Sequence, residues 1–249
     1  MNRQKIGKTH LYYVIFMTGI YTLWSCIKII VGSYLVKNYR PYIDRIIKKW
    51  GQRLMGLVGA EIVVAGNQHI NSLDKNRRVI VMCNHSSLYD VPVVAMALNT
   101  SFRFVAKKEL YRIPIFGTAI KKAEFISIDR QNREQAIKDL ELAKAKMLDG
   151  ITLWMAPEGT RSEDGKLRKF KRGAFHIAID TQALIVPIVV KDVHKVQAGT
   201  VIEIYPNRKV HVEICAPIDA AEFTLDKRAE LVSIVRGSML QALGQKEGE

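Results

Sequence analysis

A long apolar run near the start of the chain limits most strongly what this sequence can fold into. Residues 11–36 contain a single charged side chain, Lys28. As a helix rising about 1.5 Å per residue, the run would reach about 39 Å, enough to cross the roughly 30 Å hydrocarbon core of a bilayer with some tilt. We therefore expect a membrane segment. A cleaved signal peptide is the alternative, because cations precede the run, but no A-x-A-like cleavage site follows it.

Both flanks of the run are basic, which leaves its topology open. Residues 1–53 hold ten Lys and Arg against one Asp, and most of these cations follow the run. The positive-inside bias favours the cytoplasm for that richer flank and for the rest of the chain. Either the run spans the membrane, or it enters and returns with a bend near Gly19 or Gly32 and Ser33.

Residues 39–58 have the pattern of an amphipathic helix. Isoleucines, Trp50 and leucines share one face, and cations occupy the other. Such a helix either lies in the membrane interface or packs its apolar face into a protein core while its basic face stays solvated. The pattern favours neither, so residues 1–60 are predicted as an N-terminal membrane-associated helical segment.

From residue 61 onward, short β-branched runs alternate with longer helical patterns. This alternation predicts an α/β fold, with a largely buried mixed sheet flanked by helices, as a single layered domain over residues 61–249. We expect strands at 61–65, 79–83, 102–106, 123–128, 152–156 and 184–190, and a hairpin of 201–205 with 210–214. Helices are expected at 91–98, 133–148, 175–181 and 225–243.

Composition excludes several classes of protein. A net charge of +14 could indicate nucleic-acid binding, but no helix-turn-helix, finger or RNP-type pattern is present, so anionic lipid or a phosphorylated substrate is the expected partner. Three widely spaced Cys indicate neither a disulfide framework nor a zinc site. The histidines are dispersed without carboxylates at ligand spacing, so no metal or other cofactor is expected, and His176 is expected to be structural.

The residues with chemical potential follow predicted strands. Residues 84–90 read Asn-His-Ser-Ser-Leu-Tyr-Asp, directly after the apolar strand at 79–83. Asp90 could turn back to hold one imidazole nitrogen of His85, which leaves the other nitrogen free to take a proton. Alternatively, Ser87 and Asp90 form a capping box at the start of the next helix. Taken alone, an H-x-x-x-x-D spacing is a weak signal.

Three further blocks accompany this one in order along the chain. The second block runs from Val105 through Lys107 to the Ile-Asp-Arg of residues 128–130. The third is Pro-Glu-Gly-Thr-Arg-Ser at 157–162, followed by Phe-Lys-Arg-Gly-Ala-Phe at 170–175. The fourth is Val-Pro-Ile at 186–188. Together with residues 84–90, they resemble the glycerolipid acyltransferase family over residues 60–217. The similarity is greatest to its 1-acylglycerol-3-phosphate (lysophosphatidate) acyltransferase branch.

The resemblance implies a function and a role for each site residue. The chain would transfer a fatty acyl group from a thioester, acyl-CoA or acyl-carrier protein, to the free hydroxyl of lysophosphatidate in phospholipid biosynthesis. His85 would be the general base and Asp90 its orienting partner. Lys107, Arg130 and Arg161 would bind the phosphate, and the acceptor's glycerol part would be positioned by Glu158, Gly159 and Thr160. Glu158 could also be an ordinary ion-pair partner of Arg161.

Two positions differ from the residues that are common in the family. Ala156 stands where Phe is usual, and Ala123 stands where Gly often occurs. We expect these changes to alter the shape of the site near the acyl or glycerol end. Another lysolipid or glycerol 3-phosphate is therefore the alternative acceptor, and a non-catalytic membrane-anchored lipid-binding protein is the alternative from a different class.

Overall fold

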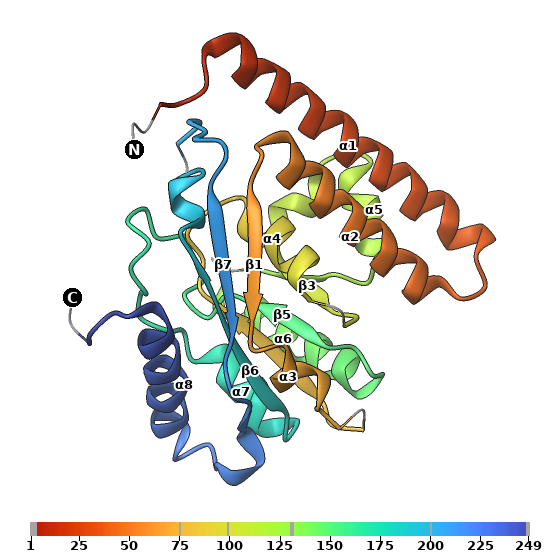
Figure 1. The fold of residues 1–249 in the computed structure, drawn as a ribbon. Coiled ribbons are helices and arrows are strands. Elements are labelled where there is room, and N and C mark those ends of the chain that lie inside the picture. The colour runs from red at the N-terminus through yellow and green to blue at the C-terminus, as the bar shows by residue number, and fades with distance from the viewer. Residues whose placement is uncertain (1–3, 75, 99, 130–131, 200, 248–249) are drawn as a thin grey trace.

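A central sheet with helices on both faces organises the molecule (Figure 1). The computed structural model describes residues 4–74, 76–98, 100–129, 132–199 and 201–247. Within these residues the path across the sheet runs β1 (Glu61–Ala65), β7 (Lys209–Ile214), β6 (Leu184–Lys191), β2 (Val79–Cys83), β5 (Leu153–Met155), β3 (Arg103–Lys107) and β4 (Ile126–Ile128). A short strand, β8 (Ile218–Asp219), also pairs with β6. The pairings of β6 with β7 and β8 are antiparallel and the others are parallel, which confirms the expected mixed sheet.

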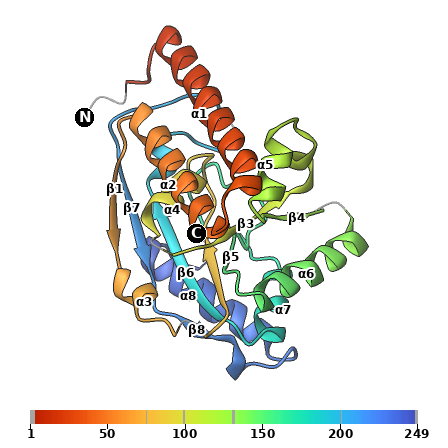
Figure 2. The ribbon, with the colours of Figure 1, turned by 90° about the vertical axis from the view of Figure 1, so that its right-hand side faces the viewer.

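Alternate residues of the central strands enter two separate hydrophobic cores. In β2, Val79, Val81 and Cys83 join one core, whereas Ile80 and Met82 join the other. Since successive side chains of a strand point to opposite faces, a strand that is apolar throughout must be covered on both sides. One face is covered by α1 (Lys8–Leu35), α2 (Tyr39–Leu57) and α4 (Asp90–Ala97), and the other by α6 (Arg133–Leu148), α7 (Gly173–Asp180) and α8 (Arg228–Leu243), as Figure 2 shows.

The N-terminal apolar run forms one uninterrupted helix that pairs with the amphipathic one. Helix α1 passes through Gly19 without a bend, and the chain reverses at residues 36–38 (Figure 1). A Cβ atom on Gly32 would lie 2.2 Å from the ring of Tyr42, so glycine there allows α1 and α2 to approach closely. Among the described residues, α1 is the one helix long and apolar enough to cross a membrane.

The two helices differ in how they bury their apolar side chains. Helix α2 buries Ile43, Ile46 and Ile47 in the core and packs against both α4 and α1, so the core interpretation holds for its apolar face. Helix α1 instead exposes many large apolar side chains: Tyr12, Tyr13, Ile15, Phe16, Ile20, Leu23, Trp24, Ile27, Val31, Tyr34 and Leu35. An exposed apolar surface of this extent on a single helix marks an interaction site.

Several expectations about secondary structure were wrong in detail. Residues 201–205 form no strand, and β7 pairs with β6 and β1 instead of with them in a hairpin. The strand expected at 123–128 is limited to β4, because residues 123 and 124 complete the end of α5 (Phe116–Lys122). Helix α5 and the short helices α3 (Asn67–Asn71), η1 (Lys108–Arg112), η2 (Val193–Lys195) and η3 (Ala220–Glu222) were not anticipated.

Candidate active site

His85 lies just beyond the carboxyl end of β2, where the side chain of Asn84 extends the sheet. The Asn84 amide donates to the carbonyl oxygen of Val190 at 3.1 Å and accepts from its N–H at 2.7 Å. The side chain therefore makes the pair of contacts that a backbone unit would make with β6. This anchors the last residue before His85 and allows the chain to leave the sheet at His85.

Asp90 turns back onto the imidazole of His85. Its Oδ2 lies 2.6 Å from His85 Nδ1 and also accepts the backbone N–H groups of Ser86 at 2.8 Å and Ser87 at 2.9 Å. Asp90 is fully buried at the first position of α4, so three donors converge on one carboxylate oxygen away from water. The helix begins only at Asp90, but part of the expected capping box forms, since Ser87 N–H donates to Asp90 and Ser87 Oγ accepts the N–H of Tyr89 at 3.1 Å. Nδ1 is occupied by Asp90, so Nε2 is the ring nitrogen left for a substrate proton.

The carboxylate of Glu158 holds two separate backbone segments. Oε1 accepts the N–H of His85 at 2.7 Å, and Oε2 accepts the N–H of Arg168 at 2.8 Å. Ser162 N–H in turn donates to the carbonyl of His85 at 2.8 Å. Residues 158–162 therefore bind both backbone polar groups of His85. Burial raises the pKa of Glu158 to about 7, against the opposing effect of the two N–H donors.

Parallel strands bring the candidate phosphate-binding residues to the same edge. Strands β2, β3 and β5 run in one direction, so His85, Lys107 and Glu158 lie at or just beyond their carboxyl ends. Lys107 Nζ is 3.2 Å from Glu109 and its side chain is half exposed. Arg161 has its Nη1 buried without a hydrogen-bond partner among the described residues. The third expected cation, Arg130, lies outside the described residues.

A cavity of about 600 Å³ joins these groups to an apolar interior. Its polar lining consists mainly of His85, Lys107, Gly159, Thr160 and Arg161. Its apolar lining comes from several elements and includes Cys26, Ile29, Ile46, Ile47, Trp50, Phe104, Leu110, Phe116, Ile120, Phe125 and Trp154. The cavity is thus amphipathic, with titratable and cationic groups at one end and hydrocarbon surface along the remainder.

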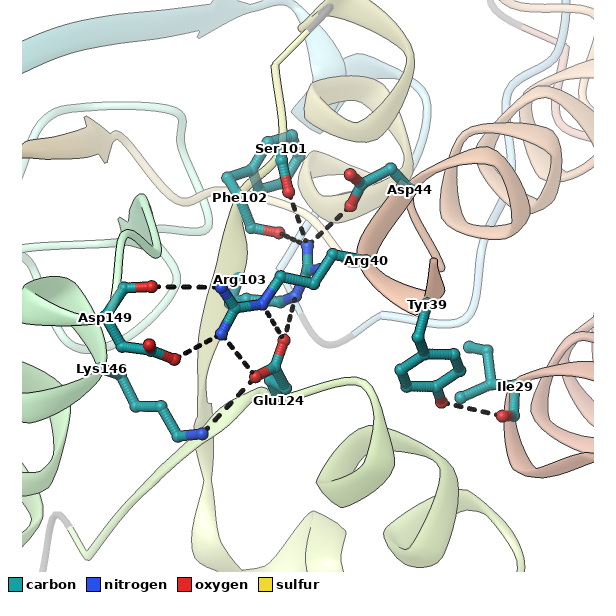
Figure 3. A network of polar contacts seen from close by, with 10 residues as sticks. All are labelled: Ile29, Tyr39, Arg40, Asp44, Ser101, Phe102, Arg103, Glu124, Lys146 and Asp149. Carbon is teal, nitrogen blue, oxygen red and sulfur yellow. Dashed lines mark hydrogen bonds and ion pairs between the residues drawn. The ribbon is translucent and has the colours of Figure 1, made fainter. Parts of the chain in front are cut away.

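The cavity follows β3 from the edge of the sheet beside His85 toward a network of charged residues. Phe104 through Lys107 line it, a distance of about 10 Å along a strand. One residue beyond Phe104, the buried Arg103 donates to Asp44 of α2 at 2.7 Å. Arg40 of α2 binds both oxygens of Glu124, at 2.8 and 2.9 Å, and also reaches Asp149 (Figure 3). Helix α2 is thereby fixed to the strand, to the end of α5 and to the end of α6.

The two positions that differ from the common family residues both line the cavity. Ala123 and Ala156 are among its lining residues, and Ala123 is buried beside Glu124. The expected effect on the shape of the site is therefore consistent with their position. Sequence reasoning missed the contribution of α1 and α2 to the cavity wall. The apolar face of residues 39–58 was a signal, but its partner could not be identified.

His176 lies apart from the cavity, whereas Cys26 is one of its lining residues. His176 is on α7, on the opposite face of the sheet, with Nε2 3.7 Å from Asp180. Cys26, Cys83 and Cys215 are free thiols. Among the residues that the structure describes, no group of three or more His, Cys, Asp or Glu side chains is arranged to hold a metal ion.

Comparisons with known proteins agree with this geometry. The Acyltransferase family profile matches residues 61–191. The chain is 30% identical over 239 residues to the 1-acyl-sn-glycerol-3-phosphate acyltransferase of Haemophilus influenzae, covering 94% of this chain and 95% of that protein. It is 30% identical to the enzyme of the same name from Cocos nucifera, of which it spans 62%. The crystal structure of the 1-acyl-sn-glycerophosphate (LPA) acyltransferase PlsC from Thermotoga maritima superposes with a TM-score of 0.82 at 27% identity, covering 95% of this chain and 94% of that one.

Proposed function

This chain belongs to the Acyltransferase family, and we propose that it transfers a fatty acyl group from an acyl thioester to the free hydroxyl of a lysophosphatidate, giving phosphatidate. The observation that carries the proposal is the contact between His85 and Asp90 at the polar end of an amphipathic cavity. The polar end of the cavity, with its cations, suits the free hydroxyl end of a lysophosphatidate, and its apolar walls suit the hydrocarbon chain. The names of the similar proteins support the same acceptor.

In the proposed reaction His85 acts as the general base. Its Nε2 takes the proton of the acceptor hydroxyl while that oxygen attacks the thioester carbonyl. The tetrahedral intermediate collapses with cleavage of the C–S bond, and the departing thiolate receives the proton from the imidazolium. Asp90 fixes the ring orientation and stabilises the imidazolium. The thioester supplies the driving force, so the proposed reaction requires no cofactor, and either acyl-CoA or acyl-carrier protein can be the donor.

The acceptor phosphate would bind to the cations around the cavity. We assign this role to Arg161 and Lys107, and by family resemblance to Arg130. The unpartnered buried Nη1 of Arg161 supports its assignment, because a buried guanidinium N–H without a partner is costly. Gly159 and Thr160 line the cavity and would contact the glycerol part. Glu158 would assist indirectly, since both of its oxygens already accept backbone N–H groups.

The membrane is the proposed source of the lipid substrates. We assign residues 1–60 to a membrane-associated unit and residues 61–249 to the acyltransferase domain, which would face the cytoplasm. One face of α1 packs on α2 and α5 while its other face exposes apolar side chains. A helix that is covered by protein along one side suits insertion into one leaflet better than a full crossing of the bilayer.

An acceptor panel with the purified protein in detergent micelles tests this function. We expect acyl-CoA to release free thiol rapidly with lysophosphatidate and slowly with lysophosphatidylcholine or glycerol 3-phosphate. Preference for either of the latter two would support the alternative acceptors. No acceptor-dependent release from acyl-CoA or acyl-carrier protein with any of them would favour a lipid-binding protein without catalysis.

The phosphate assignment predicts a selective effect of Arg161→Lys. Lysine keeps the charge but loses the planar pair of donors, so the KM for lysophosphatidate should rise by about tenfold while the KM for the acyl donor stays nearly unchanged. Arg228→Lys on α8, on the other face of the sheet, is the matched control and should change neither constant. An equal rise in KM for the acyl donor and for lysophosphatidate would contradict the assignment.

A further inference from the structure

A buried glutamine beyond the residues that the family profile matches binds the turn that holds His85 and Asp90. Gln197 follows η2, beyond the matched range of residues 61–191, and its side chain is 3% exposed. It is 110 residues away in sequence from Ser87, which it contacts directly. None of the four sequence blocks includes it, so the resemblance to known acyltransferases assigns it no role.

The carboxamide of Gln197 uses both of its ends. Its Oε1 accepts from the hydroxyl of Ser87 and from the N–H of Leu88, both at 3.0 Å. Its Nε2 donates to three carbonyl oxygens of its own segment, those of Ala198 at 3.0 Å, Gly199 at 3.3 Å and Val201 at 2.7 Å. An acceptor facing the turn and donors facing carbonyls are properties of an amide, which a carboxylate or an apolar side chain lacks.

The turn bound by Gln197 is the same one that supplies donors to Asp90. Ser86 and Ser87 direct their backbone N–H groups at Asp90 Oδ2, while the carbonyl of Ser86 accepts from Gly199 N–H at 2.9 Å. Residues 197–199 therefore hold residues 86–88 through the Gln197 side chain and the Gly199 backbone. A shift of this turn would move the donors away from Asp90, and with them the carboxylate that orients His85.

We propose that Gln197 is a positioning residue that keeps Asp90 aligned with His85 for acyl transfer. Its contribution to rate rests on the proposed function, whereas its effect on the imidazole is independent of any substrate. Gln197 touches neither the cavity nor the reacting atoms, so its loss should lower kcat and leave the KM for lysophosphatidate unchanged.

The variant Gln197→Glu gives a readout that a purely structural role would not produce. Its carboxylate could still accept from Ser87 and Leu88, but the second oxygen would face three carbonyls without a proton to donate. Protonation restores one donor. We therefore expect kcat to be close to wild type at low pH and to fall by about tenfold or more relative to wild type as pH rises, with Gln197→Ala low throughout.

Gln245→Ala is the matched control. Gln245 also joins two backbone groups through its amide, accepting from Leu167 N–H at 2.9 Å and donating to Gly165 O at 3.1 Å, but it does not contact residues 84–90. We expect its kcat and pH profile to equal those of wild type. An equal loss of kcat in Gln197→Ala and Gln245→Ala would overturn the proposal. So would a pH profile of kcat for Gln197→Glu that parallels that of wild type.

An NMR measurement separates failure of this proposal from failure of the proposed function. The His85 Nδ1–H proton bonded to Asp90 should give a low-field resonance that shifts or is lost in both Gln197 variants and persists in Gln245→Ala. An unchanged resonance in the Gln197 variants overturns the positioning role even if no acyl transfer is detected. If neither Gln197 variant folds, Ser87→Ala removes one bond to Oε1 and should show the same changes at smaller size; no change there also overturns the proposal.

Discussion

At the scale of single residues, two buried carboxylates organise the candidate site in different ways. Asp90 gathers three donors on one oxygen, all from residues 85–87. Glu158 instead joins segments that are far apart in the sequence, since it lies 73 residues from His85. The pairing of His85 with Asp90 was predictable because a five-residue separation allows a turn. The Glu158 contacts were not, because they depend on the adjacency of β2 and β5.

The raised pKa of Glu158 predicts a pH-dependent stability. The folded protein binds this proton more tightly than the unfolded chain, since burial raises the pKa from an ordinary 4.5 to about 7. Relative to Glu158→Gln, the wild type should therefore lose roughly 3 kcal/mol of unfolding free energy as pH rises from about 4.5 to about 7. Denaturant unfolding of both proteins across this range measures the difference. A pH-independent difference would show that Glu158 is not buried as described.

At the scale of elements, the position of α2 depends on charged contacts as well as on its apolar face. Arg40 binds Glu124, which follows Ala123 and precedes Phe125 in the cavity wall (Figure 3). The apolar face of α2 was predictable from periodicity. Its partners were not, because Arg40 and Glu124 are 84 residues apart and each alone looks like an ordinary surface charge. The same limitation explains the incorrect hairpin, since β-branched patterns do not specify which strands pair.

Removing the carboxylate of Glu124 should destabilise the protein only at pH values at which that carboxylate is ionised. Hydrogen bonding to Arg40 lowers the pKa of Glu124, so its contribution is present above pH 4.5 and is lost as pH falls through the lowered value. We expect Glu124→Gln to reduce the free energy of unfolding by about 1 to 2 kcal/mol at pH 7 and by less under acidic conditions.

Asp180→Asn is the matched control for this variant. It removes the longer contacts of Asp180 with Lys144 at 3.3 Å and with His176 at 3.7 Å on the opposite face of the sheet, and should have little effect on stability. A Glu124→Gln loss as small as that of Asp180→Asn at pH 7 would show that the contact does not fix α2.

At the scale of the whole molecule, the exposed apolar face of α1 is the feature that the packing of the α/β fold does not explain. The α/β architecture and most strands could be predicted from short, continuous apolar runs separated by helical patterns, because strands buried on both faces of a sheet are apolar throughout. Hydropathy identified the α1 segment but not its uninterrupted helical path or its packing on α2 and α5, which depend on close contacts such as that of Gly32 with Tyr42.

The proposed membrane attachment through this face predicts a specific response to charged substitutions. Phe16→Asp and Ile20→Asp on α1 should release part of the protein from membranes, because an aspartate in the hydrocarbon region costs about 3 kcal/mol. Ile137→Asp on α6, an equally exposed apolar position on the other face of the sheet, should not. Wild type should resist extraction by high salt. Salt extraction of the wild type, or equal release of all three variants, would contradict this attachment.

The central claim, that His85 is the base for acyl transfer to lysophosphatidate, is tested most directly by thiol release from acyl-CoA in matched histidine variants. We expect His85→Ala to lower the lysophosphatidate-dependent rate by about 10² to 10⁴ while its thermal unfolding stays close to wild type. His176→Ala, which removes a histidine on the opposite face of the sheet, should retain the wild-type rate. A folded His85→Ala protein with near-normal, lysophosphatidate-dependent turnover would contradict the claim.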